Sequence, residues 1–384
     1  MLNPKFYASV GRNKIIKKHI YNQNMNQTTT IIHKPEYNVK LVQFWLLGLL
    51  FLLLLMILIG GLTRLTDSGL SITNWEPIIG AIPPLSNSEW ILAFDQYKLT
   101  NEFKIQNFNM DLMEFKVIYW WEWGHRQFGR LIGLFWFIGF IYLLTFSKLP
   151  KLLKISFFTL GCLGLLQALI GWWMVKSGLD EEAGLLDVAS YRLAIHLNLA
   201  LIITSLIFLL IKINNNWTVN INFQTILKNF SKEEFFITIF IFSIFIQITL
   251  GALVSGIDAG KSYNEWPLMD DNFLPEDIFY LDPKYLNFFE NPATVQFNHR
   301  IMGYFLFVFG TLIWILDRFK KTPNTKIRQN YNLLLLLIIF QVVIGILAVV
   351  NAVPIYLGVL HQLFAVLLLL GTLNLRFNLF LVRN

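Results

Sequence analysis

The sequence predicts an all-α integral membrane protein with eight transmembrane helices, arranged as two tandem four-helix bundles. Apolar residues make up 55% of the chain and charged residues only 14%. Eight apolar stretches are long enough to cross about 30 Å of hydrocarbon as helices. The two halves of the chain also repeat the same motifs in the same order, as expected for an internal duplication.

The apolar stretches give approximate spans for the eight helices. In chain order these are 42–62, 124–146, 153–176, 191–213, 235–256, 299–317, 331–350 and 355–377. We therefore divide the chain into a basic N-terminal tail (1–41), a first bundle (42–213), an inner linker (214–234), a second bundle (235–377) and a C-terminal tail (378–384).

The charged residues predict the orientation of these helices. With eight crossings, both termini and the linkers near 147–154, 214–234 and 318–330 lie on one side. That side holds most of the 31 Lys and Arg but only four of the 24 acidic residues, Glu36, Glu233, Glu234 and Asp317. Positive residues mark the cytoplasmic or matrix side, so both termini are predicted there. The net charge of +7 therefore faces lipid headgroups and gives no reason to expect a nucleic-acid partner.

The first 40 residues are polar, basic and poor in acidic residues. This composition is typical of a transit peptide and also of an ordinary cytoplasmic tail. We expect a tail in a bacterial plasma membrane, with the mitochondrial inner membrane as the alternative and Met25 as an alternative start. The single cysteine, Cys162, excludes an intrachain disulfide.

Four pairs of matching segments define the repeat. GLTRLTDSGLSITNWEP (61–77) matches GALVSGIDAGKSYNEWP (251–267), and EWGHRQFGR (122–130) matches QFNHRIMGY (296–304). LQALIGWWMV (166–175) matches FQVVIGILAV (340–349), and a His opens the fourth helix of each half in AIHLNLA (194–200) and VLHQLFA (359–365). Each half has an even number of helices, so the bundles should be related by a pseudo-twofold axis along the membrane normal.

Four histidines occupy corresponding places in the two halves: His125 and His196 in the first, His299 and His361 in the second. All four lie near the outer ends of the predicted helices, where an ionisable side chain is costly. Such pairs on facing helices predict axial ligands of haem iron. A single His there would usually be an interfacial hydrogen-bonding residue. Zinc is the competing metal, although two His without Cys or carboxylates make a poor zinc site. The absence of CxxCH predicts noncovalent haem.

Arginines follow the second-helix histidines. Arg126 and Arg300 come directly after His125 and His299, and Arg130 lies one turn further, where the second half has Tyr304. A guanidinium can bind a carboxylate through two hydrogen bonds, so we predict that these arginines bind haem propionates. Contact with lipid headgroups is the alternative.

Glu122 distinguishes the two halves. It precedes His125 by three residues, and the two lie on the same helical face if the helix begins before residue 122. Gln296 occupies the matching place in the second half. A carboxylate beside only one iron predicts chemistry in the first half, with Glu122 handling protons. The second half would then hold a haem that only transfers electrons. The alternative is that Glu122 is an exposed loop acid.

Several of these segments resemble haem A synthase. The resemblance rests on GGLTRLTDSGLSITNWEPIIGAIPPLS (60–86), the region from Glu114 to Gly133, IHLNLA and QFNHRIMGY, and covers residues 42–377. The chain has no outer-loop cysteine pair and so resembles the proteobacterial and mitochondrial branch rather than the Gram-positive one. Any redox role of such cysteines cannot apply here.

The resemblance implies an oxidoreductase that oxidises the C8 methyl group of haem O to a formyl group. Successive hydroxylations give a geminal diol that loses water, and the haem A product serves terminal oxidases. By position, His125 and His196 would bind haem O, while His299 and His361 would ligate a resident haem b. Glu122 matches the essential acid of the family, and the farnesyltransferase that makes haem O is an implied partner.

Two other classes of function stay open at this point. A bis-haem b electron carrier fits the repeat and the four histidines equally well, but not the contrast between Glu122 and Gln296. A transporter also fits a parallel repeat, although the sequence shows no broken helices or midplane charges. The electron acceptor, the oxygen source and the oligomeric state, including a homo-oligomer, are not identified by the sequence.

Overall fold

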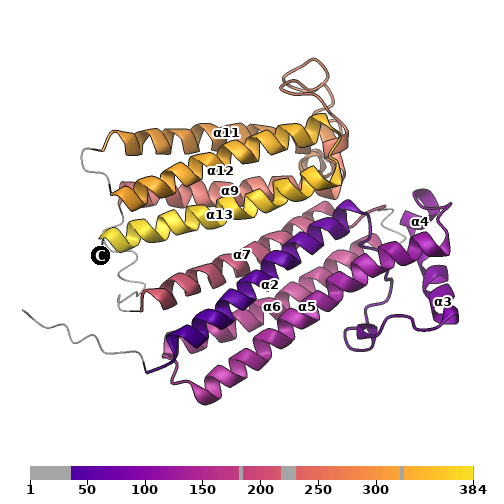
Figure 1. Ribbon diagram of the computed structural model, residues 1–384. Helices are drawn as coiled ribbons and strands as arrows, with labels where there is room; N and C mark the ends of the chain where they lie inside the picture. The colour runs from indigo at the N-terminus through magenta and orange to yellow at the C-terminus, as the bar shows by residue number, and fades with distance from the viewer. Residues whose placement is uncertain (1–35, 181–184, 218–230, 321–323, 384) are drawn as a thin grey trace, which may run out of the picture. The chain divides into compact units, whose positions relative to one another are not determined.

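The computed structural model describes residues 36–180, 185–217, 231–320 and 324–383 (Figure 1). The alternatives for the N-terminal tail fall on residues 1–35 and so lie outside the described residues. The described chain is helical, and eight of its helices are long and apolar enough to cross a membrane. The predicted all-α membrane fold is therefore confirmed.

The first half contributes four of the long helices. They are α2 (Val39–Leu65), α5 (Leu112–Phe146), α6 (Lys151–Gly178) and α7 (Ser190–Asn215). Two short helices, α3 (Asn87–Tyr97) and α4 (Asn101–Ile105), lie between α2 and α5 in the sequence. Aromatic residues join these outer helices to α5, because Phe94 and Tyr97 stack on Phe115 in a buried cluster.

The second half contributes the other four. They are α9 (Lys232–Gly256), α11 (Pro292–Arg318), α12 (Thr325–Val350) and α13 (Ile355–Arg383). A four-residue helix, α10 (Asn287–Glu290), precedes α11. Local sequence sets these starts: Ser231 and Glu234 form a capping box on α9, and Asn291 caps α11 ahead of Pro292.

Four predicted boundaries were wrong by six residues or more. Helix α5 begins at Leu112 rather than 124, α11 at Pro292 rather than 299 and α12 at Thr325 rather than 331, and α13 continues to Arg383 rather than ending at 377. Hydropathy detects only the apolar part of a helix, whereas the caps at Asp111 and Asn291 start each helix earlier, within polar sequence. His125 consequently lies well inside α5 rather than at its end.

Each half packs its long helices in the same pairwise pattern. Helix α2 contacts α5 and α7, and α6 contacts the same two; α9 contacts α11 and α13, and α12 contacts the same two. One hydrophobic core lies within the first set and another mainly within the second, and Figure 1 shows the two sets of helices. The sets meet where α7 contacts α9 and where α13 contacts α2 and α7. The pseudo-twofold axis itself stays a prediction.

Candidate functional site

A cavity of about 1190 Å³ lies among the long helices and is lined by residues from both halves. It exceeds the roughly 300–1,000 Å³ typical of a pocket for one small molecule. The predicted site residues all line it: Glu122, His125, Arg126, Arg130, His196, His299, Arg300 and His361. The fold therefore brings together every residue that the repeat singled out.

The second-half histidines face each other across this cavity. His299 on α11 and His361 on α13 have ring centroids 6.3 Å apart, with ring planes at 71°. This separation leaves room for one metal ion between the two rings. His299 and His361 would therefore hold a haem iron between them.

A glycine on a neighbouring helix accommodates each of the four imidazoles. An ideal Cβ built on Gly60 or Gly251 would lie 3.0 Å from Cε1 of His125 or His299, respectively. At Gly171 and Gly345 the corresponding distances to His196 and His361 are 2.8 and 2.9 Å. Real Cβ atoms seldom approach so closely, so any larger residue would push the imidazole away.

Glutamines contact three of these four histidines. The Nε2 atoms of Gln167 and Gln247 lie 3.2–3.3 Å from both ring nitrogens of His196 and His299, and Gln341 lies 3.3 Å from Nε2 of His361. Each Gln precedes its glycine by four residues, one helical turn away on the same face. The matching place before Gly60 holds Met56, so His125 lacks this amide.

Sequence reasoning missed the glycines and glutamines, although their signal was present. The matching segments 166–175 and 340–349 share the pattern Gln-x-x-x-Gly. Interpreting that pattern as a histidine cradle requires knowing which helices face each other, which the repeat alone does not say.

The donor set fits haem. Buried ring nitrogens, Nδ1 of His125 and Nδ1 of His361, have no hydrogen-bond partner in the described structure. No group of three or more His, Cys, Asp or Glu able to hold a metal ion occurs among the described residues. Paired imidazoles in a large apolar-walled cavity suit a planar macrocycle, whereas a zinc site needs additional ligands.

Glu122 is a buried carboxylate on α5, with 3% of its surface exposed. Its Oε2 accepts hydrogen bonds from Ser71 Oγ at 2.8 Å and from the Ile72 amide at 2.7 Å. Arg126, one turn further along α5, donates to Oε1 at 2.5 Å. The alternative that Glu122 is an exposed loop acid was therefore wrong.

The equivalent position in the second half is neutral but equally buried. Gln296 is 2% exposed and donates through Nε2 to the carbonyl of Tyr263 at 3.0 Å. Arg300 donates to the same carbonyl, also at 3.0 Å. The two halves thus share a side chain that joins helix to outer loop, and only the first half makes this side chain a carboxylate.

The three arginines also hold the loops that follow α2 and α9. Arg126 donates to the carbonyls of Ile72 and Asn74, Arg130 to those of Glu76 and Pro77, and Arg300 to that of Leu268. These bonds occupy part of each guanidinium, while all three side chains still line the cavity. Propionate binding by these arginines stays a prediction, and fixing the loops over the cavity is an observed role.

Arg64 was not singled out by the sequence. It lies near the end of α2 and pairs with Asp67 at 2.6 Å, Asp187 at 3.4 Å and Asp258 at 3.5 Å. Asp67 and Asp258 are the matching aspartates of the repeat, and both adopt left-handed backbone conformations, with φ of 47° and 51°. Arg64 therefore joins the two halves where α2 and α9 end.

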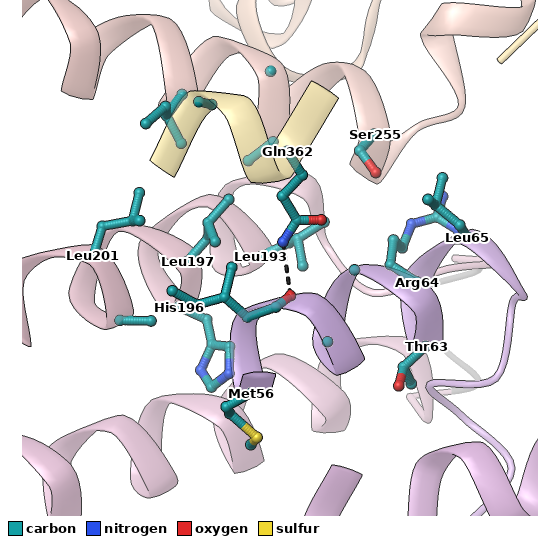
Figure 2. A pocket seen from close by; sticks show the side chains of 18 of the residues that line it. Met56, Thr63, Arg64, Leu65, Leu193, His196, Leu197, Leu201, Ser255 and Gln362 are labelled. Carbon is teal, nitrogen blue, oxygen red and sulfur yellow. Dashed lines mark hydrogen bonds between the residues drawn. The ribbon is translucent and has the colours of Figure 1, made fainter. Parts of the chain in front are cut away.

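A glutamine next to a predicted iron ligand forms a second link between the halves. Gln362, adjacent to His361 on α13, donates from Nε2 to the Ile57 carbonyl of α2 at 2.8 Å, the bond drawn in Figure 2. Gly61 lies so close to the Gln362 amide that any side chain there would collide with it. This link places the second-half site directly against the helix that supports His125.

Comparisons with known proteins agree with this arrangement. The family model described as cytochrome oxidase assembly protein matches residues 43–373. A protein of Roseobacter denitrificans named heme A synthase is 45% identical over 318 residues, which are 83% of this chain and 82% of the relative. Relatives with the same name in Dinoroseobacter shibae and a Ruegeria species are 46% and 43% identical over 82% of this chain, covering 80% and 82% of their own lengths. The chain therefore belongs to the cytochrome oxidase assembly protein family, with relatives named heme A synthase.

Proposed function

We propose that this protein is a haem A synthase, a membrane oxidoreductase that converts the C8 methyl group of haem O to a formyl group. The observation that carries the proposal is the asymmetry between two otherwise matching histidine sites. Each half places two histidines on the cavity wall, and one helical turn before the first of them lies the buried carboxylate of Glu122 in the first half but the neutral Gln296 in the second.

We assign the substrate to the first half and a resident haem b to the second. His125 and His196 would hold haem O, and His299 and His361 would hold haem b. When bound, haem iron supplies the oxidation chemistry, while the protein supplies orientation and proton handling. The glycines Gly60, Gly171, Gly251 and Gly345 leave the space in which each imidazole is positioned.

Glu122 would accept and return protons at its carboxylate oxygens. Ser71 and the Ile72 amide hold Oε2, and Arg126 holds Oε1, so the carboxylate stays in one orientation beside the His125 turn. Converting a methyl to a formyl group removes hydrogen from carbon, and a fixed carboxylate is suited to receive the protons. Gln296 cannot do this, which is consistent with a purely electron-transferring second half.

The membrane setting suits such a substrate. Haem O carries a farnesyl tail, so a cavity among membrane-spanning helices lets it arrive without leaving the bilayer. We infer that both termini face the cytoplasm or matrix, in a bacterial plasma membrane or alternatively a mitochondrial inner membrane. Haem O synthase is a further proposed partner, along with an electron acceptor and possible self-association into a homo-oligomer.

The test is the identity of the bound haem. Protein would be purified from cells that make haem O, and noncovalent haem would be extracted and identified by mass, for wild type and for Glu122→Ala. We expect haem b together with haem O or haem A in the wild type, and no haem A in the variant. Haem b alone in both preparations would instead support a bis-haem b electron carrier.

A further inference from the structure

We propose that Glu102 is a second proton-carrying carboxyl group on the first-half side of the cavity, exchanging protons between the cavity and the water outside. This inference rests on the proposed function, because it assigns a route to the protons of the same reaction. Glu102 belongs to α4 in the outer segment between α2 and α5, and no sequence motif marks it.

Glu102 is buried although its surroundings in the sequence are polar. Only 1% of its surface is exposed, and it lines the same cavity as Glu122 and His125. Its Oε2 has no hydrogen-bond partner among the described residues. A buried polar atom without a partner costs free energy, so its presence in a cavity wall points to a ligand or a proton that comes and goes.

The carboxyl group is held by the aromatic cluster between α3 and α5. Tyr97, which is fully buried in the aromatic cluster, hydrogen-bonds to it through the phenol hydroxyl. Asn107 in turn donates to the Tyr97 hydroxyl at 2.7 Å. These two residues position Glu102, which lines the cavity and whose Oε2 they leave unpaired.

The charges around Glu102 make it easy to protonate. Burial raises the pKa of Glu102 to about 8, and the negative charges of Asp187, Asp67 and Glu122 act in the same direction, against the Tyr97 hydrogen bond. Arg64 offsets part of this charge because it pairs with both aspartates. A group that titrates near neutral pH can both take up and release a proton, as a relay requires.

The second half includes no buried carboxyl group of this kind among the described residues between α9 and α11. Among its described outer residues, the buried polar side chains that precede or begin α11 are all neutral: Asn287, Asn291, Thr294 and Gln296. Asn291 donates to Asn287 at 2.8 Å and caps α11. Buried carboxyl groups thus occur at the outer end of the half assigned to chemistry, which is the half that must move protons.

The proposed step transfers a proton and no electrons. The bond between hydrogen and a donor atom in the cavity breaks, and an O–H bond forms on Glu102. On release, the O–H bond of Glu102 breaks and the proton binds to a water molecule outside. Asp187 and Asp67, with side chains 23% and 40% exposed, line the same cavity as Glu102 and are partly hydrated acids. The proton transfer does not depend on which molecule supplies the oxygen atom of the formyl group, because the reaction releases protons into the cavity in each case.

The test combines an infrared titration with a pH profile. Difference spectra between about pH 6 and about pH 10 should show loss of a protonated carboxyl band in the wild-type protein. The band should be absent from Glu102→Gln and retained in Asp95→Asn, a surface control from α3. Haem A formation should fall roughly tenfold in Glu102→Gln, and its rate should no longer change with pH near pH 8. In Glu102→Asp the rate should recover partly.

A band that persists in Glu102→Gln, or a variant that keeps the wild-type rate and pH profile, would overturn the proposal. Thermal melting and haem b content check that the variant is folded, and Glu102→Asp serves as the second variant if it is not. The two proposals can fail independently. If the wild type makes no haem A, the proposed function fails, whereas the infrared titration still tests whether Glu102 carries a proton, because it needs no turnover.

Discussion

Replacing Glu122 by glutamine removes one negative charge from the first-half site while preserving the shape of the side chain. The carboxylate accepts from Ser71, Ile72 and Arg126 at 2.8, 2.7 and 2.5 Å. An amide has one acceptor oxygen and one NH2 group, so its NH2 must face at least one of these donors. The less costly orientation gives up the bond from Arg126 and keeps the other two.

That loss sets the expected magnitudes. A hydrogen bond to a charged group contributes about 1.5–3 kcal/mol, and Arg126 keeps its bonds to the Ile72 and Asn74 carbonyls, so unfolding should become easier by about 2 kcal/mol. The fold and the haem b site should survive, as the buried Gln296 of the second half shows that glutamine is tolerated there. Haem A formation should fall at least about a hundredfold, because the proton-accepting group is gone.

The assay measures haem A formed per molecule of retained haem b, together with the melting temperature. Glu114→Gln is the matched control: it lies on the same helix, is exposed, and caps the helix start through Asp111. It should change stability little, because glutamine can also accept the bond from the Asp111 amide, and it should leave haem A formation unchanged. Formation of haem A by Glu122→Gln at the wild-type rate would refute the assignment of Glu122 as the proton-handling group.

Three further predictions follow from individual contacts. Gly345→Ala should displace His361 and lower the haem b content of the purified protein, whereas Gly164→Ala, which meets nothing within 4 Å, should not; equal haem contents by absorbance would contradict this. Gly61→Ala should break the hydrogen bond between Gln362 and the Ile57 carbonyl and destabilise the protein by about 1–3 kcal/mol. In thermal melting, the control Gly133→Ala should change little, and equal melting temperatures of the two variants would refute this prediction. The pKa of Glu102 rises from 4.5 to about 8 on folding, so the folded state binds more protons than the unfolded state between these pH values. The free energy of unfolding should therefore fall as pH rises from 4.5 to 8, by roughly 1.4 kcal/mol per pH unit at most. Glu102→Gln should flatten this dependence, and a melting temperature that changes with pH equally in variant and wild type would contradict it.

Much of the fold was predictable because hydropathy and repetition act locally. Apolar stretches located all eight membrane helices, and the matching motifs located the four histidines and the contrast between Glu122 and Gln296. Helix starts were less predictable, since α5 extends to Leu112 through a segment containing Glu114 and Lys116. There the capping box, rather than hydrophobicity, decides where the helix begins.

The rest of the site depends on packing between distant segments. Gly60 matters only because α5 brings His125 against it, and Gln362 matters only because α13 contacts α2. No sequence motif marks Glu102, and its burial arises from the packing of α3 and α4 near α5. The roles of Arg126 and Arg130 likewise depend on the path of residues 72–77, which the sequence did not specify.

The central claim is that the first half binds the substrate haem and the second half binds the resident one. The most direct test compares His196→Ala with His361→Ala, which remove matching ligands from α7 and α13. Haem extracted from each purified variant would be identified by mass. The account predicts that His196→Ala keeps haem b and loses haem O and haem A, while His361→Ala loses haem b. Loss of haem b from His196→Ala, with haem b retained in His361→Ala, would contradict it.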